Sequence, residues 1–133
     1  MAINAYSLAR DGNTALSKNF RAKEFACKDG SDPIFVDSDL VTVLQTIRDH
    51  FGRAVNINSA FRTASHNAKQ KNAAKYSQHL YGRAADIWIM GVTVDALANY
   101  IETLLPNTGG IGRYYTDGFV HVDVRKAKSR WKG

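Results

Sequence analysis

Hydrophobic residues recur along residues 38–51 at the spacing of one helix face. The apolar positions stand three or four residues apart, as an amphipathic helix requires: Leu40, Leu44, Ile47 and Phe51. Asp37 precedes this stretch and is a favourable N-cap, and Gly52 follows it as a favourable stop. The pattern predicts a helix after Asp37 whose apolar stripe belongs to the core.

Period-two alternation predicts strands further along the chain. In residues 54–60 (AVNINSA), Val55 and Ile57 alternate with asparagines, which is typical of a half-buried strand. Residues 84–90 predict a second strand. Residues 111–115 and 119–124 are separated by Thr-Asp-Gly, so they predict a hairpin.

A second amphipathic helix is expected between these strands. Thr93 can cap it, and Pro106 with Asn107 can end it. Its inward positions are Val94, Leu97, Ile101 and Leu104. The order helix, strand, loop, strand, helix, hairpin favours an α+β fold with a small, largely antiparallel sheet flanked by helices. We expect residues 1–133 to form a single domain, with residues 1–19 as an irregular N-terminal arm.

Composition and charge narrow the class of protein. A chain of 133 residues with 44% hydrophobic and 23% charged residues is an ordinary globular domain. It has no apolar run of about 20 residues and no signal-peptide pattern at its start, so we expect a product made in the cytoplasm. Cys27 has no cysteine partner and is interpreted as a small buried side chain. The net charge of +6 suggests an anionic partner.

Two histidines and two carboxylates suggest a metal site. His79 and Asp86 stand seven residues apart, and Gly82 between them permits a tight turn. In the predicted strand FVHVDV, His121 and Asp123 share the face opposite the valines. Two histidines and one aspartate can hold zinc and leave a fourth position open. Spacing alone also allows these to be ordinary polar residues.

The same residues lie in segments that resemble a known family. SQHLYGRAAD (residues 77–86) resembles the Ser-x-His-x-x-Gly-x-Ala-x-Asp motif of the zinc D-Ala-D-Ala carboxypeptidase family, which includes phage L-alanyl-D-glutamate endopeptidases. FVHVDVR resembles that family's strand with the third zinc ligand, and NINSAFRT and GGIGRYY resemble its neighbouring strands. FACKDGSD resembles phage and prophage members. The resemblance covers about residues 20–131 and implies the family's hedgehog-like α+β fold.

The resemblance implies a role for each matching residue. It makes His79, Asp86 and His121 the ligands of one zinc ion. Arg62 would bind a substrate carboxylate or steady a developing oxyanion, and the segment before His79 would contact substrate through Ser77 and Gln78.

The general base is where the sequence departs from the better-known members. They often carry an acid or a histidine two or three residues before the last ligand, where this chain has Phe119 and Gly118. Asp117, in the predicted hairpin loop, is our preferred base. Asp123 is its competitor, and it could instead orient a neighbouring group.

The implied function is zinc-dependent hydrolysis of amide bonds in peptidoglycan stem peptides, as a D-Ala-D-Ala carboxypeptidase or an endopeptidase-type endolysin. We expect a monomer with no nucleic-acid or membrane partner, acting at the bacterial cell wall after phage-mediated release or as a virion component. One alternative is an inactive, zinc-holding wall-binding domain. Another is a basic nucleic-acid-binding module, suggested by the tail RKAKSRWKG, which is more simply a solvated basic tail.

Overall fold

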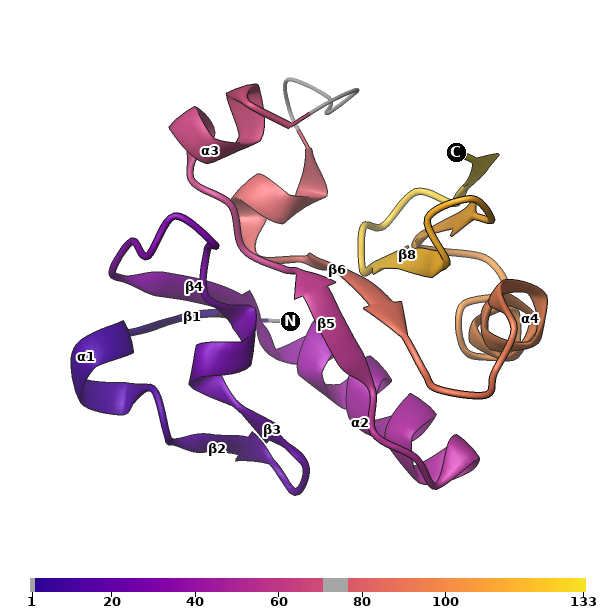
Figure 1. Cartoon of the computed structure of the whole chain (residues 1–133), viewed down its shortest axis with the longest axis horizontal. Helices are drawn as coiled ribbons and strands as arrows, with labels where there is room; N and C mark the ends of the chain where they lie inside the picture. Colours follow the sequence, from indigo (N-terminus) through magenta and orange to yellow (C-terminus); the bar gives the residue numbers. More distant parts are fainter. Residues whose placement is uncertain (1, 71–76) are drawn as a thin grey trace.

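A five-stranded sheet forms the centre of the protein. A computed structural model describes residues 2–70 and 77–133 (Figure 1). The strands lie in the order β5-β6-β8-β7-β9, and all neighbours are antiparallel except β7 and β9, which are parallel. Their bounds are β5 Asn56–Ser59, β6 Ala84–Trp88, β7 Gly110–Tyr114, β8 Phe119–Asp123 and β9 Ser129–Lys132. The predicted α+β class and largely antiparallel sheet are confirmed.

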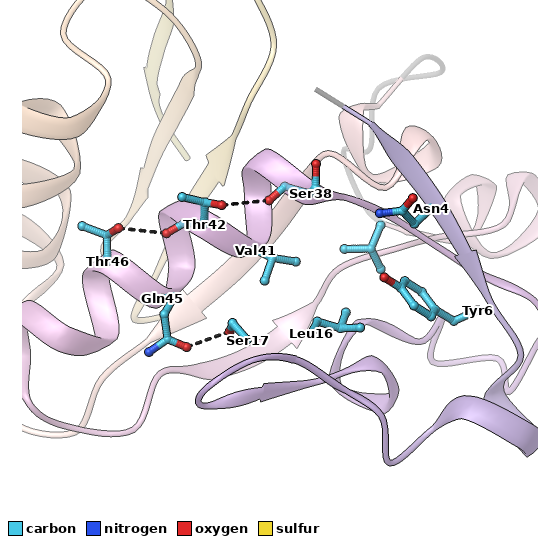
Figure 2. Close-up of a pocket in the computed structure, with 10 residues that line it drawn as sticks. Asn4, Tyr6, Leu16, Ser17, Ser38, Val41, Thr42, Gln45 and Thr46 are labelled. Atoms are coloured by element: carbon cyan, nitrogen blue, oxygen red, sulfur yellow. Dashed lines mark hydrogen bonds between the residues drawn. The ribbon is translucent and has the colours of Figure 1, made fainter.

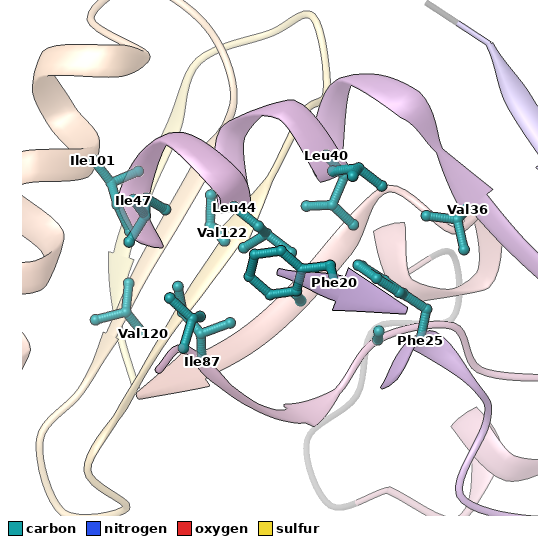
Figure 3. Packing of buried hydrophobic residues seen from close by; sticks show 14 of the residues in the cluster. Phe20, Phe25, Val36, Leu40, Leu44, Ile47, Ile87, Ile101, Val120 and Val122 are labelled. Carbon is teal, nitrogen blue, oxygen red and sulfur yellow. The ribbon is translucent and has the colours of Figure 1, made fainter. Parts of the chain in front are cut away.

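The predicted helices are α2 (Ser38–Phe51) and α4 (Val94–Leu104). The Asp37 carboxylate accepts a hydrogen bond from the Asp39 backbone N–H at 2.8 Å, and Gly52 ends α2 in the left-handed conformation. Thr93 caps α4 through the Ala96 N–H. Figure 3 shows the apolar stripe of α2 facing side chains of β6 and β8, and the residues that meet there are Leu40, Leu44, Ile47, Ile87, Val120 and Val122.

The expectation of an irregular arm over residues 1–19 is wrong. This region contains β1 (Ile3–Tyr6), α1 (Leu8–Asp11) and β2 (Ala15–Ser17). β1 pairs with β4 (Ile34–Asp37), and β2 pairs with β3 (Phe20–Arg21). Each partner strand is only two to four residues long, too short for alternation to reveal it. The strands of this region are therefore fixed by their pairing with β3 and β4, and not by a hydrophobic pattern of their own.

The basic tail is also not a solvated segment over residues 129–132. β9 adds to the sheet beside β7. Arg130 donates to the Gly109 carbonyl at 2.6 Å and pairs with Glu102 on α4. The backbone pairing and these contacts use the tail to close one edge of the sheet.

Three short helices complete the described chain: η1 (Ala22–Phe25), α3 (Ala64–Ala68) and η2 (Gln78–Tyr81). In the part of the chain that the structure describes, no helix is both long and apolar enough to cross a membrane.

Candidate metal centre

His79, Asp86 and His121 come together in the structure. One ligand atom from each lies within 4.8 Å of the others, and all three side chains are buried. The Asp86 Oδ1 atom is 3.3 Å from His79 Nε2 and 3.1 Å from His121 Nδ1. Two imidazole nitrogens and a carboxylate oxygen in one buried cluster are a donor set that suits zinc.

Sheet register explains why two of these residues meet. Asp86 on β6 is the direct cross-strand partner of His121 on β8, and such partners carry their side chains on the same face about 4.5–5.5 Å apart. The same row continues across the sheet through Ser59, Asp86, His121, Gly112 and Trp131. The candidate site is therefore built on one transverse row of the sheet.

His79 reaches this row from η2, which ends at Gly82. Gly82 has φ +68°, and its N–H donates to the His79 carbonyl at 3.3 Å. Its own carbonyl accepts the Asp37 N–H at 2.8 Å, and a Cβ at this position would collide with the Phe35 carbonyl oxygen. Only glycine meets both demands, which gives a physical reason for glycine at this point of the motif.

We expect Gly82→Ala to destabilise the fold more than Gly52→Ala. Gly52 also has a positive φ, +63°, but a Cβ there would meet nothing within 4 Å. Its substitution therefore incurs the left-handed cost of about 1–2 kcal/mol. Gly82→Ala adds a collision worth about 1–3 kcal/mol. Urea unfolding of both variants measures the difference, and equal losses would show that the Phe35 contact is unimportant.

Hydrogen bonds fix the ring orientations of both histidines. His79 Nδ1 lies 2.7 Å from the Ala60 carbonyl oxygen, which can only accept, so this nitrogen carries the proton. His79 Nε2 is therefore the ring nitrogen that faces Asp86. His121 turns Nδ1 to Asp86 and Nε2 to Asp123 Oδ2, the latter at 2.7 Å.

Asp123 is a fully buried carboxylate that orients His121. Besides His121, its oxygens accept hydrogen bonds from the Gly110 N–H at 2.9 Å and from the backbone and guanidinium of Arg125. Burial raises the pKa of Asp123, but the hydrogen bonds from His121 and Arg125 outweigh it and hold that pKa below its usual range. These contacts favour the orienting role over that of a free base.

Arg62 lies beside Asp86 and is only 12% exposed. Its Nη2 is 3.3 Å from Asp86 Oδ2, its Nε donates to Ser59 Oγ at 3.0 Å, and its Nη1 donates to Asn67 Oδ1 at 3.2 Å. Arg62 thus forms a largely buried ion pair with Asp86 at the site, and not a surface salt bridge. Burial raises the pKa of Asp86, but hydrogen bonds from both cluster histidines outweigh it and lower that pKa.

The remaining predicted site residues occupy different positions. Ser77 caps η2, where its Oγ accepts the His79 N–H at 3.2 Å. Gln78 has a buried Oε1 with no hydrogen-bond partner among the described residues. Asp117 lies in the exposed turn between β7 and β8, and no hydrogen bond or ion pair found in the described chain joins it to the cluster. The role of Asp117 as a base stays a prediction.

Trp131 is a site residue that sequence reasoning missed. Its ring centroid is 4.9 Å from that of His121, and its Nε1 donates to the Tyr114 hydroxyl at 2.9 Å. Gly112 lies between the two rings in the row, and a Cβ there would collide with the indole. The glycine in GGIGRYY was the available signal, because a strand glycine often marks a close approach by another group.

We expect zinc binding to release protons and to weaken as pH falls. Burial lowers the pKa of His121, but hydrogen bonds to Asp123 and Asp86 outweigh it and raise that pKa above its usual value. A cation must displace the proton that faces Asp86, so its apparent affinity should rise by up to about tenfold per pH unit until pH passes the raised pKa. Calorimetry in buffers of different ionisation enthalpy measures the proton release. A pH-independent affinity would contradict this expectation.

A groove of about 360 Å³ lies away from the cluster, between α2 and the N-terminal strands (Figure 2). Several of the polar side chains that line it form hydrogen bonds within the protein. Ser17 Oγ donates to Gln45 Oε1 at 2.7 Å, and Thr42 and Thr46 donate to carbonyl groups of α2. None of the predicted site residues lines this groove.

Comparison with known proteins agrees with the site. Residues 17–123 match the family model described as Peptidase M15. The chain is 31% identical over 105 residues to the probable peptidoglycan L,D-endopeptidase MepK of Haemophilus influenzae, covering 74% of this chain and 55% of that protein. It is 34% identical over 77 residues to the peptidoglycan L,D-endopeptidase MepK of Escherichia coli K12, covering 57% of this chain and 38% of that protein.

The chain spans about half the length, or less, of these curated relatives. No solved structure gave a significant match. The family model covers most of the chain and includes all three residues of the buried cluster. On this match and the cluster it contains, the chain belongs to the peptidase M15 family.

Proposed function

We propose that this protein is a zinc-dependent peptidase that hydrolyses amide bonds in peptidoglycan stem peptides. The observation that carries the proposal is the convergence of His79, Asp86 and His121 in one buried cluster within the residues that match the peptidase family. The curated relatives, named as peptidoglycan L,D-endopeptidases, support the substrate class. Because these relatives are named endopeptidases, they also favour cleavage of an internal peptide bond over removal of a terminal D-Ala.

The cluster residues would hold the ion through His79 Nε2, His121 Nδ1 and an oxygen of Asp86. Zinc bound there would supply Lewis-acid polarisation of the scissile carbonyl and activation of water. Asp123 keeps the His121 ring in place, and the Ala60 carbonyl keeps that of His79. These supporting contacts fix the ligands before substrate arrives.

Three further side chains would handle the substrate. Arg62 holds Asp86 and adds permanent positive charge beside the cluster, which suits a stem peptide carrying carboxylates. Gln78 precedes His79, and its side-chain amide would contact the peptide once its buried Oε1, which has no hydrogen-bond partner among the described residues, becomes exposed. Asp117 would take a proton from the attacking water and pass it to the leaving amine.

Digestion of purified peptidoglycan tests the proposal. The protein is incubated with walls of several chemical types, with chelator and with zinc restored, and the released fragments are identified by mass spectrometry. Chelator-sensitive cleavage inside the stem peptide is the expected result. Release of D-Ala alone would identify a carboxypeptidase, and a zinc-loaded protein that releases nothing would identify a wall-binding domain.

The proposal includes the setting that we expect from the sequence, namely release at phage lysis or carriage in a virion. The net charge of +6 complements an anionic wall polymer. Wall binding that weakens steeply with salt would agree with this charge pairing.

A further inference from the structure

A second cluster of metal-ligand side chains lies outside the candidate metal centre. Cys27, Asp29 and His66 each offer one ligand atom, and these atoms lie within 4.8 Å of one another. The cysteine is buried, the histidine is partly buried and the aspartate is exposed. The same spacing limit holds for the cluster of His79, Asp86 and His121. None of the three residues of the second cluster is used by the proposed function.

Thr63 ties the second cluster together. Its hydroxyl donates to Asp29 Oδ2 at 2.8 Å and accepts the His66 backbone N–H at 3.2 Å, which caps α3. Its backbone N–H lies 3.5 Å from the Cys27 sulfur and donates to it. An N–H directed at sulfur stabilises a thiolate, since such contacts tune metal-bound sulfurs. Thr63 therefore holds the loop that carries Cys27 and Asp29 against helix α3, which carries His66.

We propose that Cys27, Asp29 and His66 form a second metal site, which takes a divalent transition-metal cation of the zinc class. Thiolate and imidazole donors select such cations over magnesium and calcium, which prefer oxygen ligands. One sulfur, one nitrogen and one oxygen make three protein ligands, and zinc completes a tetrahedron with a fourth. The exposed side, where Asp29 lies, admits water as that fourth ligand.

Charge at the cluster suits a cation. The exposed Asp29 carboxylate accepts hydrogen bonds from the Ser31 N–H at 2.9 Å and from the Thr63 hydroxyl at 2.8 Å. It offers a cation a negatively charged oxygen ligand. A cation would replace the proton of the Cys27 thiol, as metal binding to cysteine requires.

The second site would also brace the first. Phe61 N–H donates to the Phe25 carbonyl at 3.2 Å, two residues before Cys27. The adjoining Ala60 carbonyl holds His79, and Arg62 holds Asp86. A cation bound by both Cys27 and His66 would therefore hold residues 60–62 in place, and these residues support the candidate metal centre.

Cobalt spectroscopy tests the second site without any measurement of peptidase activity. Metal-free protein is titrated with Co²⁺, and the thiolate-to-cobalt charge-transfer band in the near ultraviolet is recorded. The chain contains one cysteine, so this band can arise only from Cys27. We expect two equivalents of bound cobalt and a band whose intensity corresponds to one thiolate per protein chain. Binding without the band would overturn the proposal.

Variants separate the two sites. Cys27→Ser should lose the band and one equivalent, whereas His121→Ala should lose the other equivalent and keep the band. His66→Asn gives a second route if Cys27→Ser fails to fold, and it should weaken the band at limiting cobalt. Cobalt content that is unchanged in both second-site variants would show that the cluster is only a hydrogen-bonded helix cap. Failure of His121→Ala to lose metal would instead count against the proposed function.

Discussion

Replacement of His121 by alanine is expected to abolish zinc binding at the candidate metal centre and, with it, peptidase activity. The substitution removes one of three ligands and leaves the carboxylates of Asp86 and Asp123 without their shared imidazole. Loss of a group that merely supports a ligand commonly lowers metal affinity by about 10–100-fold. Loss of the ligand itself should exceed that range. Metal analysis after gel filtration and digestion of peptidoglycan measure the two losses.

His50→Ala is the matched control for this experiment. His50 is exposed on α2, and its ring stacks on that of Tyr100 with centroids 3.6 Å apart. No contact found among the described residues joins His50 to the cluster. The control should keep its metal and its activity. A folded His121→Ala protein that retained a full complement of zinc at the first site would refute the ligand assignment. Circular dichroism of each variant shows whether it is folded.

Elements stabilised by local pattern could be predicted from the sequence. α2 and α4 each carry an apolar stripe and a capping side chain within a few residues, so no distant partner is needed to recognise them. The β7–β8 hairpin is likewise a local structure, with its turn containing Gly118. The N-terminal strands and β9 depend on partners elsewhere in the chain, and their own residues show little alternation. This dependence on distant partners explains why these strands could not be predicted from the sequence.

The candidate site divides in the same way. His79 and Asp86 are close in sequence and joined by the turn at Gly82, and the alternation of β8 places His121 on the polar face. The cover provided by Trp131 could not be foreseen, because it depends on parallel pairing of β9 with β7. The sequence also could not show how many hydrogen bonds Asp123 accepts, because Gly110 donates to it from the neighbouring strand β7.

The identity of the base can be settled by comparing Asp117→Asn with Asp123→Asn. Asp117 is exposed in a turn, so its substitution should leave stability and zinc affinity unchanged. Loss of a general base typically lowers the rate by about 10²–10⁴-fold, and this loss should appear in kcat and persist at saturating zinc. Asp49→Asn, another exposed aspartate, is the control and should be silent.

Asp123→Asn should behave differently because the carboxylate is buried and accepts from His121, Gly110 and Arg125. An amide there presents an N–H group to donors, so the variant should lose stability and bind zinc about 10–100-fold more weakly. Excess zinc should restore much of its activity, since a residue that orients a ligand acts through occupancy of the site. Full kcat in Asp117→Asn, combined with a loss in Asp123→Asn that excess zinc does not repair, would transfer the role of base to Asp123. The zinc dependence of kcat therefore separates proton transfer from ligand positioning.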